Sequence, residues 1–206
     1  MIEERVLRKW FELTSVVPLG VYVLVHLGSY LRALFGATEF GAGSGSGFEL
    51  ALEIVLVWLP LGFHALYGAW LTPRPIAASG LERNRTLLLR ASGIALLAFL
   101  AYHSYWLRRP HLRGERSPAD VANALAAGLS ATEWGIPIVA IVHLLGLGAL
   151  CVHLAAGLAR SLVNFGLAGA ARAQLVARAL SITLFCLSSA TVVELATGSA
   201  LPNFVR

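Results

Sequence analysis

Residues 136–163 read IPIVAIVHLLGLGALCVHLAAGLARSLV, and this stretch decides the fold. Its only charged side chain is Arg160, close to the end. A helix of about 20 apolar residues crosses the ~30 Å hydrocarbon core of a bilayer, because each residue adds about 1.5 Å. The stretch therefore predicts a membrane-spanning helix, with Pro137 in the first turn, where a missing N–H costs little.

Four more apolar stretches of similar length accompany this one. The five predicted spans are 15–35, 50–71, 87–107, 136–163 and 175–196. The chain of 206 residues is 57% hydrophobic and 13% charged, whereas soluble domains carry roughly 25% charged residues. We therefore expect a single all-α domain over residues 1–206, an integral membrane bundle of five transmembrane helices.

The segments within and between the spans give further expectations. Pro18 and Pro60 lie inside spans and are expected to kink them, which membrane helices tolerate. The glycine-rich loop 36–47 is expected to hold no chemistry, and residues 118–129 predict a short amphipathic helix along the membrane surface. Charged residues before a full-length first span indicate a retained helix rather than a cleaved signal peptide.

The basic residues predict a cytoplasmic N-terminus, because Lys and Arg are enriched in cytoplasmic loops. The inner set is then Arg5, Arg8, Lys9, Arg74, Arg83, Arg85, Arg90, Arg160, Arg172 and Arg178. The outer set is Arg32, Arg108, Arg109, Arg113, Arg116 and Arg206. The net charge of +5 is explained by loops that face anionic lipid, so we expect no nucleic-acid partner.

Four histidines lie inside four different spans, at His26, His64, His103 and His153. Ionisable groups are costly in a bilayer, so they usually face a bundle interior and serve a purpose. Imidazole is a common axial ligand of haem iron. One histidine on each of four helices suits two bis-histidine haem sites, although each histidine alone also fits a hydrogen-bonded packing role.

Depth in the membrane sorts these four histidines into two pairs. With the N-terminus inside, His26 lies about eleven residues into the outward-running first span, and His103 about sixteen into the third. His64 and His153 lie about fourteen and seventeen residues into the inward-running second and fourth spans. Depth therefore predicts an outer pair, His26 with His103, and an inner pair, His64 with His153.

Two more histidines fall outside these pairs. His143 is ten residues before His153, about 15 Å higher along the same helix. It either touches a propionate, a quinone or water, or is a packed polar residue, whereas His111 is expected to be solvated. A diiron or copper site is disfavoured, because no carboxylate or second histidine stands one turn from a ligand. Cys151 and Cys186 form no paired motif, which disfavours covalent haem, zinc and iron–sulfur sites.

Short motifs surround the four paired histidines. VVPLG (16–20) precedes His26, LEI (52–54) and LP (59–60) precede HALYG (64–68), RASG (90–93) precedes His103, and GL (157–158) and NFG (164–166) follow His153. In this combination and order the chain resembles the dihaem cytochrome b membrane anchors of succinate dehydrogenases and fumarate reductases, of the kind with a single anchor subunit of five helices.

The resemblance implies two haem b groups whose axial ligands are His26, His103, His64 and His153. It selects His153 over His143, because only His153 is followed by the combined pattern of Gly157-Leu158 and Arg160. It also implies a bacterial cytoplasmic membrane location, a flavoprotein and an iron–sulfur subunit on the cytoplasmic face, and menaquinone or ubiquinone as electron acceptor. FAD and the iron–sulfur clusters belong to those partners, since this chain has no dinucleotide fingerprint and no cluster cysteines.

Other residues are candidates for weaker roles. Arg90 and Arg160 are expected near the propionates of the inner haem, or are ordinary positive-inside anchors; Arg32 or Arg108 could serve the outer haem. Glu53 is a costly carboxylate near the outer end of its span, and we expect it to exchange protons with a quinone. The candidate quinone-lining residues are Ser29, Tyr30 and Trp106, with Glu194 a weaker acidic candidate. Cys151 stands where some family members carry a glutamate, so a proton path of that type is not expected.

Several alternatives stay open at the sequence level. The chain could serve a quinol:fumarate reductase, or anchor another dehydrogenase such as a hydrogenase or formate dehydrogenase. A haem-free transporter or assembly protein is a remoter alternative, which the sparse intramembrane carboxylates disfavour. The direction of turnover, the quinone type, the haem potentials and the oligomeric state are not determined by these residues.

Overall fold

The computed structural model describes residues 2–31, 34, 51–112 and 118–198, and the fold is stated for these residues alone. Their elements are α1 (Ile2–Val16), α2 (Pro18–Leu31), η2 (Ile54–Trp58), α4 (Leu59–Leu71), α5 (Gly80–Leu112), α6 (Pro118–Ser130), α7 (Ile138–Asn164) and α8 (Ala170–Thr197). Within these ranges there is no strand, only an isolated bridge between Glu133 and Ile136.

Among the described residues, five helices are long and apolar enough to cross a membrane. They are Val6–Leu31, Ala51–Leu71, Gly80–Trp106, Ile138–Asn164 and Ala170–Thr197. Large apolar side chains point outward from them, and Leu66, Leu145 and Leu175 are each more than two-thirds exposed. In lipid such exposure costs little, because the tails are as apolar as the side chains. The predicted all-α class with five spans is confirmed.

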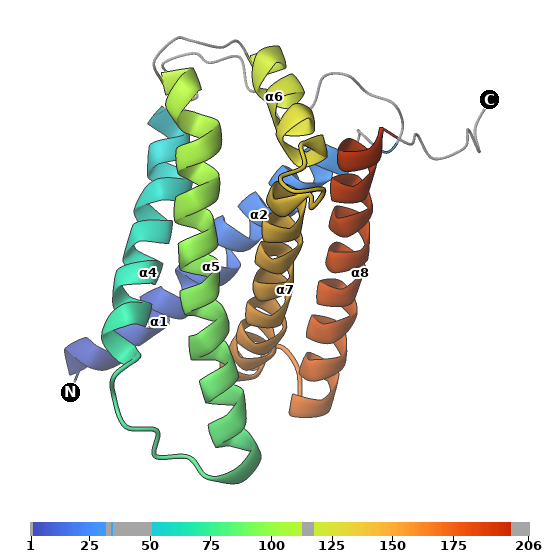
Figure 1. Cartoon of the computed structure of the whole chain (residues 1–206). Helices are drawn as coiled ribbons and strands as arrows, with labels where there is room; N and C mark the ends of the chain where they lie inside the picture. Colours follow the sequence, from blue (N-terminus) through green and yellow to red (C-terminus); the bar gives the residue numbers. More distant parts are fainter. Residues whose placement is uncertain (1, 32–33, 35–50, 113–117, 199–206) are drawn as a thin grey trace.

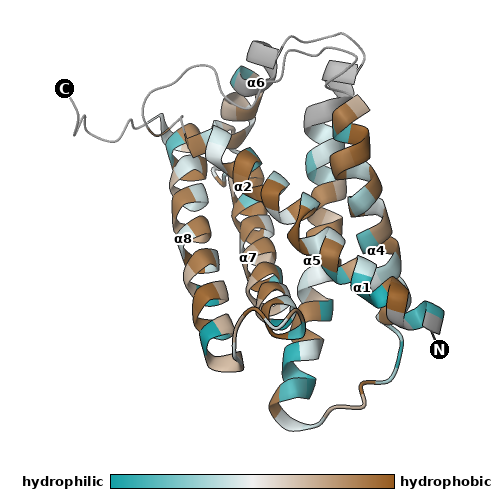
Figure 2. Ribbon diagram, turned by 180° about the vertical axis from the view of Figure 1, so that it is seen from behind, coloured by the Kyte–Doolittle hydropathy of each residue, from teal (hydrophilic) through white to brown (hydrophobic). Residues whose placement is uncertain are grey.

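The helices form a bundle in which one span crosses the others obliquely. Figure 1 shows α4, α5, α7 and α8 standing side by side, while α1 and α2 run diagonally across the back. The N-terminus and the connections 72–79 and 165–169 lie at one end of the bundle, and α6 lies at the other. Apolar residues dominate the middle of α7 and α8, and hydrophilic residues gather at the ends nearest the N-terminus (Figure 2).

The two intramembrane prolines change the helix geometry where they lie. Pro18 has no N–H to donate, and the first span divides beside it into α1 and α2. Pro60 follows the π-helical turn η2, a wider turn with i→i+5 hydrogen bonding that often marks functional sites. Helices also extend past the predicted spans, since the first begins at Val6 and the fifth at Ala170. Polar residues at a helix end continue the helical backbone hydrogen bonding, although they lie outside the apolar stretch from which a span is predicted.

The predicted short helix between the third and fourth spans is present as α6. Its apolar residues Leu125 and Leu129 are almost fully buried, in a core cluster with Ala140, Leu147 and Val192 of α7 and α8. The apolar side of α6 therefore closes one end of the bundle.

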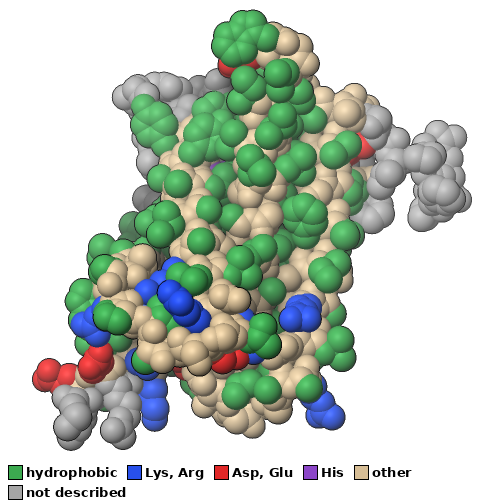
Figure 3. Space-filling model, turned by 60° about the horizontal axis from the view of Figure 1, so that its bottom comes forward, with side chains coloured by type: hydrophobic (Ala, Val, Ile, Leu, Met, Phe, Trp, Pro, Cys, Tyr) green, Lys and Arg blue, Asp and Glu red, His purple; other side chains and the backbone are tan. Residues whose placement is uncertain are grey.

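Basic side chains gather at the opposite end, which we call the basic end (Figure 3). The described basic side chains of that end are Arg8, Lys9, Arg74, Arg83, Arg85, Arg90, Arg160, Arg172 and Arg178. Of the predicted outer set, Arg32, Arg113, Arg116 and Arg206 lie outside the described residues. The side chains of Arg108 and Arg109 also lie outside the described part.

Candidate functional site

A large cavity opens between the helices of the bundle. Its volume is about 1960 Å³, whereas pockets for small ligands usually measure about 300–1,000 Å³. The histidines that line it are His26, His64, His103, His143 and His153. The cavity therefore has room for more than one large group, and five imidazoles form part of its wall.

The histidines of the cavity form two clusters. The one nearer the basic end, which we call the second cluster, consists of His64 of α4 and His153 of α7. The two ring centroids are 6.0 Å apart and the ring planes are 89° to each other. His153 Nδ1 lies 3.2 Å from the carbonyl oxygen of Leu89, and because a carbonyl only accepts, this nitrogen carries the hydrogen and donates. In the neutral ring Nε2 then keeps its lone pair, the form that binds a metal.

Both imidazole rings of this second cluster pack closely against residues of neighbouring helices. Phe11 of α1 stacks face to face on His64, with centroids 4.3 Å apart. A Cβ added at Gly93 of α5 would lie 3.1 Å from His153 Cε1, so glycine allows the ring to approach the helix closely. His64 Nδ1 is buried and has no hydrogen-bond partner among the described residues. A buried nitrogen of this kind is costly unless a bound group satisfies it.

The first histidine cluster joins His26 of α2, His103 of α5 and His143 of α7. The centroids of His26 and His103 are 6.1 Å apart, and their ring planes are 85° to each other. The Tyr22 hydroxyl lies 3.3 Å from His26 Nδ1, one turn earlier on the same helix. His143 Nε2 lies 3.4 Å from His103 Nδ1. The structure thus brings together both pairs that depth predicted, and adds His143 to one of them.

The geometry and chemistry of the two pairs fit haem better than a bare metal ion. Two imidazoles that bind opposite sides of one ion at about 2 Å each have ring centroids roughly 6 Å apart. A bare ion usually needs three or four protein ligands, and no group of three or more His, Cys, Asp or Glu in the described ranges could hold one. Haem iron needs only axial ligands from the protein. The unpartnered His64 nitrogen and the space beside Gly93 are further features that a bound macrocycle would use.

Arg90 and Arg160 both line the cavity near the second cluster. Arg90 follows Leu89 directly, and its Nη1 donates to the carbonyl oxygens of Thr72 and Arg74 at 2.7 and 2.8 Å, which caps the end of α4. Arg160 Nη2 donates to Thr86 Oγ1 at 3.1 Å. Both guanidiniums are thus held at the rim of the site, with other N–H groups available to an anionic ligand.

The predicted quinone residues divide into two groups. Glu53 and Tyr30 line the cavity, whereas Ser29 and Trp106 are not part of its wall. Trp58 Nε1 donates to Glu53 Oε1 at 3.0 Å, and this spacing of five residues matches the wide turn of η2. Trp106 packs instead on α6, where a Cβ added at Gly128 would lie 2.4 Å from its ring. Arg32 and the side chains of Arg108 and His111 lie outside the described part of the chain.

Sequence reasoning did not identify three features of the site. The stacking of Phe11 on His64 joins distant parts of the chain and leaves no local signal. The Tyr22–His26 contact does have a local sequence signal, because residues four apart share a helix face. The contact of His143 with His103 depends on how α5 and α7 are rotated, which hydropathy does not encode.

Together, the fold and the site define a class: a multi-span helical membrane protein with partly buried histidines paired across helices. Comparison with known proteins agrees with this class. The chain is similar to the succinate dehydrogenase cytochrome b558 subunit of Bacillus subtilis (strain 168), with 26% identity over 187 residues, 86% of this chain and 88% of that protein. This similarity confirms the predicted resemblance to the cytochrome b subunits of succinate dehydrogenase. No family model and no solved structure matches the chain.

Proposed function

We propose that this chain is the haem-binding membrane subunit of a succinate:quinone oxidoreductase and conducts electrons to membrane quinone. One observation carries the proposal: two histidine pairs, with centroids 6.0 and 6.1 Å apart, line one cavity in a five-span bundle. The name of the similar Bacillus protein, a cytochrome b558 subunit of succinate dehydrogenase, supports it. Haem b, when bound, supplies a one-electron carrier.

The chain's own residues have distinct roles in this proposal. His26 and His103 would hold one haem, and His64 and His153 would hold the other. The two pairs differ in level by about 15 Å, the rise of α7 from His143 to His153, which covers half of a ~30 Å membrane core. Arg90 and Arg160 offer N–H donors to propionates beside the second pair.

Glu53 and Tyr30 are the proposed quinone-contacting groups, because both line the cavity beside the first cluster. A quinone that gains two electrons also takes up two protons, so its site needs a group that exchanges protons. Glu53 is a carboxylate at the start of its span, and Trp58 donates to one of its oxygens. Tyr30 lies beside His26, with ring centroids 5.1 Å apart.

The proposed partners are a flavoprotein and an iron–sulfur subunit that dock at the basic end, on the cytoplasmic side of a bacterial membrane. Basic residues concentrate on cytoplasmic segments, which favours this orientation. The chain itself carries no proposed site for succinate. Reduction of fumarate by quinol uses the same arrangement in reverse and is the second candidate direction.

The test is the haem-to-protein ratio and a redox-titrated visible spectrum of the chain purified in detergent with its accompanying subunits. We expect two low-spin b haems per chain, reduced by added succinate. Two haems that succinate does not reduce would indicate another dehydrogenase as the partner. A well-folded preparation without haem would contradict the proposal and return the histidines to packing roles.

A further inference from the structure

We propose that His143 is a positioning residue for His103, which holds the His103 ring as an Nε2 ligand by accepting a hydrogen bond from its Nδ1–H. The inference rests on the proposed function, in which His103 binds haem iron. Among the described histidines that line the cavity, it assigns a role to the one that belongs to neither ligand pair.

The hydrogen-bond inventory of the two rings determines their tautomers. His143 Nδ1 lies 2.8 Å from the carbonyl oxygen of Val139, one turn earlier on α7. A carbonyl cannot donate, so His143 Nδ1 carries the hydrogen, and in the neutral ring Nε2 is an acceptor. The atom 3.4 Å from that acceptor is His103 Nδ1, which must therefore be the donor. His103 Nε2 is left with its lone pair.

The second cluster reaches the same result with a different acceptor. There His153 Nδ1 donates to the backbone oxygen of Leu89 at 3.2 Å. Metal-binding histidines generally donate their other N–H to a carboxylate, a carbonyl or water, which fixes the tautomer and raises the basicity of the ligand. His143 supplies for His103 what a backbone carbonyl supplies for His153.

Packing fixes His143 in this position. Its residue exposure is only 5%, and its ring lies edge-on to Phe99, with centroids 5.6 Å apart. Phe99 also lies against His103, with centroids 5.4 Å apart. A Cβ added at Gly146 would lie 2.3 Å from the Phe99 ring, so this glycine gives Phe99 its space. The contact between the two histidines is therefore built into the α5–α7 interface.

Both proposed haem sites have two histidine ligands, but they differ in the group that accepts the hydrogen bond from Nδ1 of one ligand. An imidazole acceptor stabilises the more electron-donating form of His103 and favours ferric over ferrous iron at that site. Loss of an outer-shell partner typically costs about 10–100-fold in metal affinity, and we expect the ferric form to lose about tenfold more affinity than the ferrous form. For a one-electron couple this is a rise of about 59 mV in midpoint potential.

The test compares His143→Asn with His143→Gln in the complete complex. A glutamine amide reaches the position of Nε2 and keeps an acceptor there, whereas asparagine is too short. We expect two haems in both variants and a raised potential for the first-cluster haem in His143→Asn alone. His26→Ala, which removes that haem, identifies which potential belongs to it. Ser92→Ala is the matched control, because Ser92 Oγ lies 3.4 Å from His153 Nδ1 in the second cluster, so we expect it to leave the potential of the first-cluster haem unchanged.

Equal potentials in His143→Asn and the unchanged protein would overturn the inference, as would equal shifts in the Asn and Gln variants. A haem-free preparation distinguishes failure of this inference from failure of the proposed function. In that preparation, nitrogen-15 chemical shifts of labelled histidine report the tautomers directly. We expect His103 as the Nδ1–H form, changed by His143→Asn. An Nε2–H form of His103 in the unchanged chain would refute the role of His143 even if no haem binds.

Discussion

At the scale of single residues, hydrogen-bond partners at Nδ1 influence which nitrogen of each imidazole can bind a metal. Three of the four proposed ligands have Nδ1 within hydrogen-bond distance of a protein group: Tyr22 for His26, His143 for His103 and the Leu89 carbonyl for His153. Only His64 has its Nδ1 unpartnered within the described residues. The acceptors beside His103 and His153 leave Nε2 as the metal-binding nitrogen of those two rings, whereas the Tyr22 hydroxyl can either donate to or accept from His26 Nδ1.

Replacing one ligand should remove one haem and spare the other. We expect His153→Ala and His64→Ala to lose the second-cluster haem, because a single imidazole holds iron much more weakly than a pair. His143→Ala should keep both haems, since His143 is not in a ligand pair. The measurement is the pyridine haemochrome ratio per purified chain. Loss of a haem in His143→Ala with two haems retained in His153→Ala would reverse the assignment.

The glycine beside His153 gives a second test at this scale. Gly93→Ala places a Cβ 3.1 Å from His153 Cε1, so the ring must shift by a few tenths of an ångström. We expect lower haem retention at the second cluster and a changed low-spin spectrum of that haem, with the first-cluster haem unaffected. Gly28→Ala is the matched control, because no atom lies within 4 Å of its added Cβ. Identical spectra in the two variants would show that the close approach at Gly93 is irrelevant.

The histidine pairing could be predicted from the sequence, whereas the role of His143 could not. The rise per residue of a helix is fixed, so counting along each span gives the depth of His26, His64, His103 and His153. Contact between His143 and His103 depends also on helix rotation and on side-chain rotamers. These are set by packing details such as the Gly146–Phe99 approach, which hydropathy does not report.

Among the elements, α5 and α7 carry most of the site and their interface has little spare volume. Gly146→Ala would place a Cβ 2.3 Å from the Phe99 ring, which overpacks the interface. Overpacking typically costs about 1–3 kcal/mol, which for a chain of this length lowers Tm by roughly 2–12 °C. Thermal unfolding in detergent, followed by circular dichroism, measures the loss.

The same helix supplies the control for this prediction. A Cβ at Gly148 would meet only Phe185, at an ordinary 3.9 Å. Gly148→Ala should therefore leave Tm unchanged or raise it slightly, because alanine is the better helix former. Equal Tm values for the two variants would mean that Phe99 moves aside freely, and the packing argument for His143 would lose its support.

Element boundaries were the least predictable part of the fold. The apolar stretches locate the five spans, but α5 begins at Gly80 and α8 at Ala170, where charged residues follow within a few positions. An apolar stretch of sequence ends where these charged residues occur, although the helix continues through them. Arg83 and Arg172 lie in these first turns, where lipid headgroups and water solvate them.

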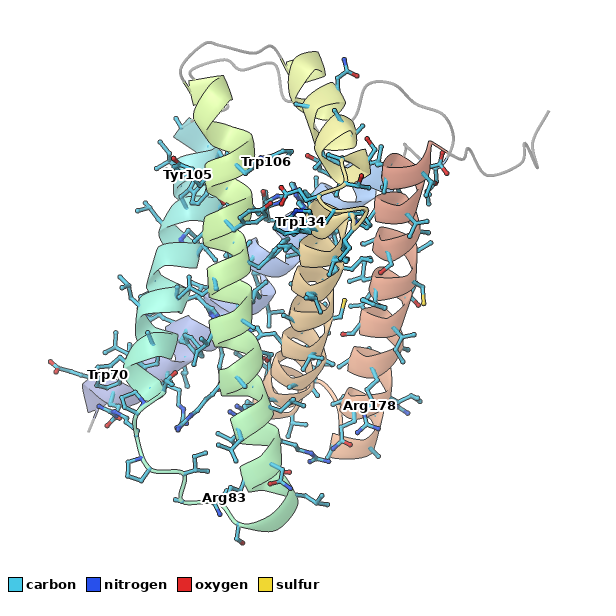
Figure 4. All side chains as sticks on the ribbon, viewed as in Figure 1. Trp70, Arg83, Tyr105, Trp106, Trp134 and Arg178 are labelled. Carbon is cyan, nitrogen blue, oxygen red and sulfur yellow. The ribbon has the colours of Figure 1, made fainter. Side chains whose placement is uncertain are left out.

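At the scale of the whole molecule, the asymmetry of charge predicts how the bundle lies in the membrane. Described Lys and Arg side chains gather at the basic end (Figure 3), whereas α6 and the turn with Trp134 close the other end. Figure 4 places Arg83 and Trp134 on opposite halves of the molecule, with Arg83 near the 72–79 connection. Cytoplasmic segments carry the excess of basic residues, so we expect the basic end to face the cytoplasm.

Single-cysteine labelling tests this orientation. In a background where Cys151 and Cys186 are replaced by alanine, Arg83→Cys and Trp134→Cys each give one accessible thiol; Trp134 is 92% exposed. We expect a membrane-impermeant maleimide to label Trp134→Cys in intact spheroplasts and Arg83→Cys only after inside-out vesicles are prepared. The succinate-dependent reduction of haem in each variant shows that the complex is still assembled.

The opposite labelling pattern would have consequences beyond topology. The second histidine cluster lies toward the basic end, so its haem is proposed to be nearest the cytoplasmic partner and Glu53 nearest the far side. A basic end outside the cytoplasm would exchange these positions and place the proposed quinone group beside the iron–sulfur subunit. Electron entry and quinone reduction would then share one face, and the two-haem path across the bundle would have no function. The labelling result therefore tests the direction of electron flow as well as the placement of the helices.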